Sequence, residues 1–182
     1  MRITGGILKG RVIKCPDGII RPAMDKMRES VFAIIGDLTG ANFLDLFSGS
    51  GTIAIEAVSR GATSVELVEK DRIKRSTIIS NVAVTEEELG NRINCHFIPV
   101  ELFLERCKNK YDYIFCDPPF PYKFHFELIE TIAKRNLLKK DGKVMIHRPA
   151  EKNMIDKIIN LSLFDRRIYG RSIVDFYIND KG

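Results

Sequence analysis

The chain contains no tryptophan, only three histidines, and four cysteines that form no C-x-x-C pair. Cys15, Cys95, Cys107 and Cys116 lie far apart and have no histidine at ligand spacing, so neither a zinc site nor a disulfide framework is predicted. No stretch approaches the roughly twenty apolar residues that cross a membrane, and the N-terminus lacks the apolar core of a secretion signal. These absences favour a cytoplasmic protein with no metal and no membrane partner.

The length and composition predict a single domain. The chain has 182 residues, of which 45% are hydrophobic, and this is enough to bury one core. The formal net charge is +5, and all of the excess lies in residues 1–28, which hold seven basic and two acidic side chains. The rest of the chain carries 22 basic and 22 acidic side chains, so it is neutral. A basic segment on a neutral body is typical of a polyanion-binding surface, although a solvated terminus has the same composition.

From residue 42 onward, short apolar runs alternate with longer amphipathic stretches, which is the rhythm of a βαβ fold. Buried parallel strands are predicted at 43–47, 64–69, 93–98, 111–116 and 143–147. Helices are predicted near 52–60, 71–84, 100–107, 124–135 and 151–160. Segments 163–169 and 172–178 flank a turn at Gly170-Arg171, which predicts an antiparallel hairpin at the end of the sheet. The sequence therefore predicts an α/β, Rossmann-like fold.

The first forty residues do not follow this rhythm. Extended pieces at 2–4 and 11–14 flank several glycines, which predicts a small hairpin. A helix is expected from about Asp25 to Ile35, after Arg21-Pro22. We therefore divide the chain into a basic N-terminal extension at 1–22 and a catalytic domain at 23–182.

An apolar strand runs straight into a glycine-rich turn at residues 43–52, which read FLDLFSGSGT. Glycine lets the backbone turn sharply and approach a ligand, and the free N–H groups at the following helix start favour a negative group. Glu69, at the end of the next strand, is placed to accept hydrogen bonds from ribose hydroxyls. The pattern indicates an adenosine ligand. Gly49-x-Gly51-x-x-Ala54 also satisfies the NAD fingerprint, and a purely structural glycine turn is a third interpretation.

The fourth strand ends in Asp117-Pro118-Pro119-Phe120, at the same sheet edge as the glycine turn. Ligands of open α/β sheets collect at that edge. This segment has the groups needed to activate the exocyclic amino group of a nucleic-acid base. Such an amine is a poor nucleophile because its lone pair is delocalised into the ring. Hydrogen-bond acceptors for both of its N–H groups favour the pyramidal form that can attack. Asp117 supplies one acceptor and the Pro118 carbonyl another, while Phe120 offers a face for stacking the flipped base. The alternative is a purely structural role, in which the Pro-Pro turn only ends the strand.

With a sulfonium methyl donor such as S-adenosylmethionine, the enzyme needs mainly to align amine, methyl and sulfur. The residues predict a methyltransferase that acts by direct in-line transfer without a metal, and no cysteine is placed to form a covalent intermediate.

These residues resemble the RsmD-type methyltransferases, which modify the N2 amine of a guanine in bacterial 16S ribosomal RNA. The likeness covers nearly the whole chain. Its specific parts are RITGG at the N-terminus and the segment RPAMDKMRESVF at 21–32. The glycine turn and the Asp-Pro-Pro-Phe signature also match, but they occur in many amino-methyltransferases.

The resemblance implies a seven-stranded, mostly parallel class I methyltransferase fold, and a substrate that is 16S ribosomal RNA or an assembling small subunit. We also expect the protein to be a cytoplasmic monomer. The resemblance assigns the catalytic role to residues 117–120. The cofactor contacts it implies are Gly49, Gly51 and Glu69, with Asp45 and Phe47 beside them. We add Ser48, Lys70 and Glu101 as candidate cofactor-binding residues. The RNA-binding residues it implies are Arg2, Lys9, Arg11, Arg21 and Arg28.

The chain departs from the family pattern at three places. Ala23 replaces a threonine, and Pro99 replaces the Asp or Asn that receives the adenine amine, with Glu101 as a stand-in. His147-Arg148 follows the fifth strand, where a carboxylate is usual.

Other functions stay open at this stage. The same four-residue signature serves adenine-N6 methyltransferases of RNA or DNA. From other classes, the chain could be an NAD-dependent oxidoreductase, which leaves residues 117–120 unexplained, or a nucleotide-binding module that has kept the fold and lost catalysis.

Overall fold

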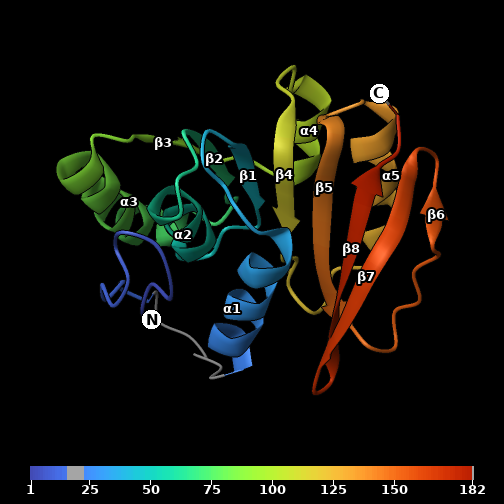
Figure 1. The fold of residues 1–182 in the computed structure, drawn as a ribbon, viewed down its shortest axis with the longest axis horizontal. Coiled ribbons are helices and arrows are strands. Elements are labelled where there is room, and N and C mark those ends of the chain that lie inside the picture. The colour runs from blue at the N-terminus through green and yellow to red at the C-terminus, as the bar shows by residue number, and fades with distance from the viewer. Residues whose placement is uncertain (16–22, 182) are drawn as a thin grey trace.

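The computed structural model describes residues 1–15 and 23–181. Within this part of the chain, eight strands form one sheet in the order β3-β2-β1-β4-β5-β8-β7-β6 (Figure 1). Neighbours from β3 to β5 are parallel, and β5, β8, β7 and β6 pair antiparallel. The predicted sheet of seven strands gains one more, because the two-residue β6 (Lys157–Ile158) pairs with β7 at the outer edge.

The parallel half of the sheet follows the predicted rhythm closely. Its strands are β1 (Asn42–Leu46), β2 (Ser64–Val68), β3 (Ile93–His96), β4 (Tyr111–Cys116) and β5 (Leu138–Pro149). β5 is longer than predicted, because it begins at Leu138 and continues beyond His147. Successive side chains of a strand point to opposite faces, so Phe43 packs into one apolar core and Leu44 into the other.

Two helical layers cover these faces. α1 (Ala23–Ile35), α2 (Thr52–Ser59) and α3 (Arg75–Leu89) lie on the face of Phe43, whereas α4 (Val100–Arg106) and α5 (His125–Lys134) lie on the face of Leu44. A short 3-10 helix, η1 (Arg72–Lys74), precedes α3. α3 also runs five residues beyond its predicted end. The hairpin of β7 (Leu161–Tyr169) and β8 (Ser172–Asn179) confirms the predicted C-terminal antiparallel pair.

The helix predicted at 151–160 is wrong. This segment is a connection of turns that contains only β6. Its carbonyl groups bind tertiary partners instead of helical N–H groups: the Lys152 carbonyl accepts from Arg148, and the Ile155 carbonyl accepts from the Tyr177 hydroxyl. Ile159 also has a φ of 55°, which ends any regular helix. Tertiary contacts therefore override the apolar spacing that suggested a helix.

The N-terminal segment packs against the body rather than standing off as an appendage. Arg2 and Val12 form an antiparallel bridge, in line with the predicted hairpin. Ile3, Leu8 and Ile13 are buried in the same apolar core as α1 and α2, and Figure 1 shows this segment beside α2. The predicted boundary at residue 22 lies outside the described residues.

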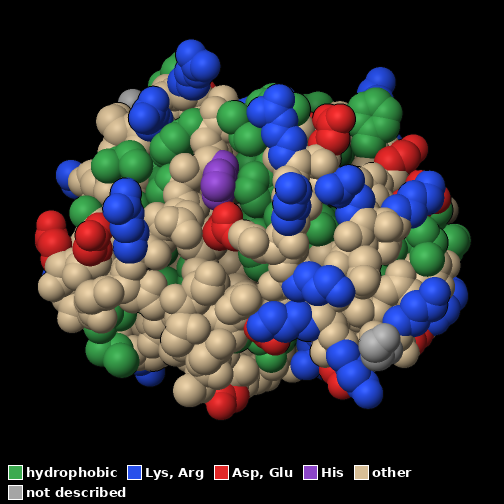
Figure 2. All heavy atoms as spheres, turned by 90° about the horizontal axis from the view of Figure 1, so that it is seen from above, with side chains coloured by type: hydrophobic (Ala, Val, Ile, Leu, Met, Phe, Trp, Pro, Cys, Tyr) green, Lys and Arg blue, Asp and Glu red, His purple; other side chains and the backbone are tan. Residues whose placement is uncertain are grey.

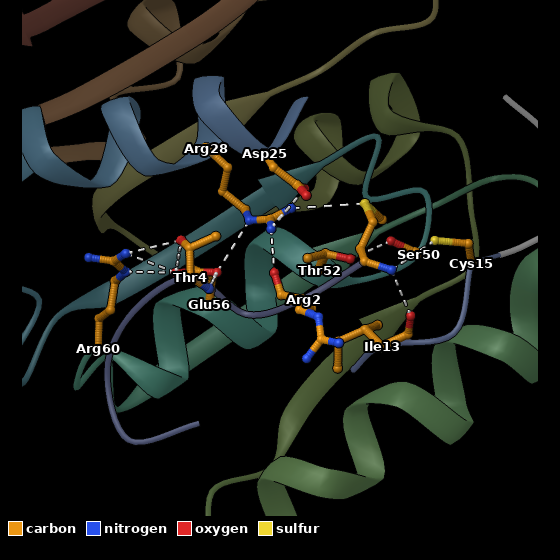
Figure 3. Close-up of polar contacts among 11 residues, drawn as sticks. Arg2, Thr4, Ile13, Cys15, Asp25, Arg28, Ser50, Thr52, Glu56 and Arg60 are labelled. Carbon is orange, nitrogen blue, oxygen red and sulfur yellow. Dashed lines mark hydrogen bonds and ion pairs between the residues drawn. The ribbon is translucent and has the colours of Figure 1, made fainter. Parts of the chain in front are cut away.

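A buried carboxylate anchors this segment. Glu56 of α2 is fully buried and accepts hydrogen bonds from the backbone N–H and the hydroxyl of Thr4. Arg28 and Arg60 reach the same carboxylate from different sides, with N···O distances of 3.2 and 2.9 Å (Figure 3). Buried charges are stable only when they are paired, so the N-terminal segment, α1 and α2 are joined as one unit.

The outer surface carries charges of both signs. Figure 2 views the molecule from the end at which β4 begins, and Lys and Arg side chains are spread over this face with hydrophobic side chains between them. None of the described helices is both long and apolar enough to cross a lipid bilayer.

Candidate active site

The glycine turn begins where β1 ends, and its backbone is unusual. Phe47, Gly49 and Gly51 have φ angles of 62°, 62° and 82°. This left-handed region suits glycine but costs a phenylalanine about 1 kcal/mol or more. A Cβ added to Gly49 would meet no atom within 4 Å, so the turn faces open space at this residue. Gly51 lies directly before α2, whose first N–H groups have no helical partners.

Glu69, just after β2, is tied to the glycine turn. Its Oε2 accepts the Gly49 N–H at 2.9 Å and its Oε1 accepts the Asp71 N–H at 2.9 Å. The Lys74 ammonium lies 3.5 Å from Oε2. The carboxylate is therefore held in a fixed orientation at the edge of the turn.

Asp45 lies beneath the turn rather than at its surface. It is 1% exposed and accepts the Ser48 hydroxyl at 2.5 Å. Burial raises the pKa of Asp45 from 3.8 to about 7; the Ser48 hydrogen bond opposes this shift, and the charges of Asp117 and Glu69 add to it. Asp45 thus gains its negative charge near neutral pH.

Asp117 follows β4 and is fixed between two neighbouring strands. Its backbone N–H donates to the Leu46 carbonyl of β1 at 3.2 Å. Its Oδ1 lies 2.7 Å from Nδ1 of His147 in β5. Pro118 is buried, Pro119 is exposed, and the Phe120 ring is 42% exposed.

One cavity of about 470 Å³ joins the glycine turn to the Asp-Pro-Pro-Phe segment. Of the residues predicted to bind cofactor or substrate, eight line it: Phe47, Gly49, Glu69, Lys70, Asp117, Pro118, Pro119 and Phe120. Asp71, Lys74, His147, Arg148 and Pro149 complete the lining. The strand order brings these segments together, because β1 lies between β2 and β4 and all three strands point the same way.

Four predicted cofactor residues do not line this cavity. Asp45 and Ser48 bind each other below the turn, and Gly51 begins α2. Glu101 lines a separate cavity of about 220 Å³, where it accepts the Tyr122 hydroxyl at 3.1 Å. Tyr122 in turn packs edge-on against Phe47, with 5.1 Å between ring centres. Glu101 is thus connected to the glycine turn through this aromatic pair.

Comparison with known proteins gives the chain a family. A family model described as Conserved hypothetical protein 95 matches residues 1–178. The chain belongs to this family. A Bacillus subtilis protein named "Putative rRNA methyltransferase YlbH" is 31% identical over 97% of this chain and 98% of its own length. "Ribosomal RNA small subunit methyltransferase D" of Escherichia coli is 28% identical over 97% of this chain and 89% of its own length.

The fold agrees with this family assignment. A solved structure described as "Putative methyltransferase yhhF from Escherichia coli" is 27% identical and has a TM-score of 0.87, covering 100% of this chain and 99% of its own. Together with the strand order, this likeness confirms the predicted class I fold of S-adenosylmethionine-dependent methyltransferases, a mixed sheet with antiparallel strands at its C-terminal end.

Several lining residues of this family member could not be assigned to the site from the sequence. Lys74 has the sequence surroundings of a solvated helix face, yet it pairs with Glu69. His147 stands out in the sequence only as a departure from the family pattern, and no local signal indicates that it contacts Asp117. Arg148 is buried in an ion pair with Asp175, at 2.6 Å between Nε and Oδ2, so its guanidinium is engaged beneath the cavity wall.

The structure separates the predicted RNA-binding residues into two groups. Arg2, Lys9 and Arg11 are exposed on the N-terminal segment, and Arg11 pairs with Glu88 of α3. Arg28 differs from these three, because its side chain is 2% exposed and is engaged by Glu56, Asp25 and the Arg2 carbonyl. Arg21 lies outside the described residues.

Proposed function

We propose that this chain transfers a methyl group from S-adenosylmethionine to the N2 amine of a guanine in small-subunit ribosomal RNA. The observation that carries the proposal is the cavity shared by Gly49, Glu69 and Asp117. It offers a cofactor cradle and an amine acceptor within one space. An NAD-dependent oxidoreductase or a non-catalytic module leaves the Asp-Pro-Pro-Phe segment without a role.

The cofactor fits the residues on one wall of this cavity. The open space above Gly49 admits a ligand against the backbone, and Glu69 is an acceptor for ribose hydroxyls. The buried carboxylate of Asp45, once ionised, complements a cationic sulfonium centre. Lys70 lines the wall beyond Glu69. S-adenosylmethionine supplies an electrophilic methyl group on positively charged sulfur.

The opposite wall would hold the target base. Asp117 accepts one N–H of the exocyclic amine and the Pro118 carbonyl accepts the other, so the nitrogen lone pair is directed at the methyl carbon. That lone pair forms the N–C bond while the electrons of the S–C bond remain on sulfur. The nitrogen then releases one proton to the Asp117 carboxylate or to solvent. Phe120 offers its exposed ring to the base removed from its stack.

The substrate assignment depends on the N-terminal segment and on the names of relatives. Arg2, Lys9 and Arg11 are exposed basic residues of the N-terminal segment, and such residues suit a phosphate backbone. The relatives named as rRNA and small-subunit rRNA methyltransferases align with nearly all of this chain. We therefore place the target in 16S ribosomal RNA, free or within an assembling small subunit, and we propose that the enzyme acts as a cytoplasmic monomer.

A labelled-methyl assay tests this function. The protein is incubated with S-adenosylmethionine that carries a labelled methyl group and with naked 16S RNA, unmodified small subunits or duplex DNA, and the products are digested to nucleosides. We expect labelled N2-methylguanosine from RNA or subunits. Labelled N6-methyladenosine would contradict the guanine assignment and favour an adenine enzyme. No transfer to any substrate, without detectable cofactor binding, would contradict the methyltransferase itself.

A further inference from the structure

Within the described part of the chain, one oxygen of the Asp117 carboxylate is engaged and the other is open to a substrate. Its Oδ1 lies 2.7 Å from Nδ1 of His147. The two residues directly follow Cys116 and Ile146, which are paired in the parallel register of β4 and β5. Two adjacent backbones therefore set this contact, and it does not depend on a mobile loop. Oδ2 is left to receive an N–H group of a substrate.

The surroundings of His147 determine which ring nitrogen carries the proton. The side chain is 14% exposed, and its Nε2 is buried without a hydrogen-bond partner among the described residues. A proton on Nε2 would be an unpaired buried donor, which costs about 1–3 kcal/mol. A proton on Nδ1 is satisfied at once by the Asp117 carboxylate, which has only acceptors. Of the two tautomers of the neutral ring, the one with Nδ1–H is thus favoured.

We propose that His147 is a positioning residue for the methyl transfer: its Nδ1–H holds Oδ1 of Asp117 and turns Oδ2 toward the amine. This inference rests on the proposed function. Without the contact, the carboxylate would rotate about its Cβ–Cγ bond and offer either oxygen over a range of directions. Alignment of the reacting atoms contributes strongly to such reactions, and a misplacement of about 1 Å can cost 10²-fold in rate.

Two substitutions distinguish a role of the His147 hydrogen bond in positioning Asp117 from a role of the side-chain volume alone. In His147→Asn, the amide nitrogen replaces Nδ1 and can donate to Oδ1. In His147→Gln, the amide nitrogen reaches the position of Nε2, away from Asp117. We expect the Asn variant to keep kcat within about threefold of the wild type, and the Gln variant to lose about 10- to 100-fold in kcat with the KM for S-adenosylmethionine unchanged.

His96 provides a matched control at the end of another strand. It contacts a carboxylate through the opposite nitrogen, with 2.7 Å between its Nε2 and Oε2 of Glu66, and it does not line the cavity. Glutamine is the conservative replacement there, so His96→Gln is expected to leave kcat unchanged. Equal loss of kcat in His147→Asn and His147→Gln, or full activity in both, would overturn the positioning role.

A second readout does not depend on activity. Nitrogen-15 NMR of the imidazole rings at pH 8 is expected to show the His147 ring protonated on Nδ1, and Asp117→Ala is expected to release this preference. An Nε2–H ring in the wild type would overturn the inference. If the wild-type protein methylates no RNA, the proposed function fails, whereas the NMR result still decides the His147–Asp117 contact.

Discussion

The Glu69 carboxylate accepts the backbone N–H of Gly49, with 2.9 Å between Oε2 and N. This bond joins the end of β2 to the glycine turn after β1, although the two residues are twenty positions apart. The remaining oxygen accepts the Asp71 N–H. A carboxylate has about four lone-pair positions, so Glu69 can hold the turn and still receive ribose hydroxyls.

Glu69→Gln is expected to weaken S-adenosylmethionine binding by about 10- to 100-fold. The amide has one acceptor oxygen and no charge. It therefore cannot accept the Gly49 and Asp71 N–H groups and also accept hydrogen bonds from the ribose hydroxyls. Each hydrogen bond to a charged group contributes about 1.5–3 kcal/mol to binding. Isothermal titration calorimetry with S-adenosylmethionine measures the effect. Glu105→Gln, at an exposed position of α4, is the control and should bind normally. If the wild type, Glu69→Gln and Glu105→Gln bind the cofactor with equal affinity, Glu69 does not contact it.

Asp117→Asn is expected to lower kcat by about 10²-fold or more while the cofactor Kd stays within about twofold. The amide retains the size of the side chain but loses the charge that complements the amine as it becomes cationic. Single-turnover methylation of unmodified subunits measures the rate. Asp112→Asn lies at the other end of β4 and should leave the rate unchanged. A rate in Asp117→Asn close to that of the wild type would contradict the catalytic role.

Asp45 makes stability depend on pH. Because its pKa is raised to about 7, the folded protein holds a proton that the unfolded chain has released between pH 4 and 7. The free energy of unfolding therefore falls across this range and levels off above it. Asp45→Asn should flatten this slope and raise the stability at pH 8 relative to the wild type. Urea denaturation at pH 5, 6, 7 and 8 tests the prediction, and parallel curves for the two proteins would contradict it.

Glu56→Gln is expected to lower the free energy of unfolding by about 3 kcal/mol. The substitution removes the buried counter-charge of the Arg28 guanidinium and leaves only the half-exposed Asp25 carboxylate beside it, and breaking a buried ion pair from one side is costly. It also removes an acceptor of the Thr4 N–H. Chemical denaturation measures the loss, and hydrogen exchange at Thr4 and Leu8 should accelerate first. Glu130→Gln, which breaks a partly exposed pair with Lys134, should cost less than about 1 kcal/mol.

The exposed basic residues of the N-terminal segment predict that RNA affinity depends on salt concentration. Changing Arg2 and Lys9 to Ala should weaken binding and reduce the slope of log K against log salt by about 0.7 to 0.9 for each phosphate that the variant no longer neutralises. Filter binding at several salt concentrations measures both quantities. Lys108→Ala with Lys110→Ala removes the same charge at the amino end of β4 and serves as the control. If both double variants give the wild-type slope, phosphates do not bind the N-terminal segment.

Most of the parallel sheet could be predicted from the sequence, because its strands are short apolar runs bounded by turns and its helices repeat their apolar residues every three or four positions. The segment at 151–160 could not be predicted in this way. Its apolar residues are spaced as in a helix, but Arg148 and Tyr177 bind its carbonyl groups from elsewhere in the chain. Such competition depends on how strands and turns pack together, so no local pattern reveals it.

The sequence by itself determined the class of fold, the glycine turn and the Asp-Pro-Pro-Phe segment, because each depends on local chemistry: apolar periodicity, the left-handed backbone of glycine, and a proline pair after a strand. Only the tertiary structure decided which charged side chains are exposed and which are buried in ion pairs. Arg28 belongs to a basic run in the sequence but is buried against Glu56, and His147 gains its partner only because β5 lies beside β4. Burial and pairing between distant segments are properties of packing, and they set the role of a charged side chain as much as its identity does.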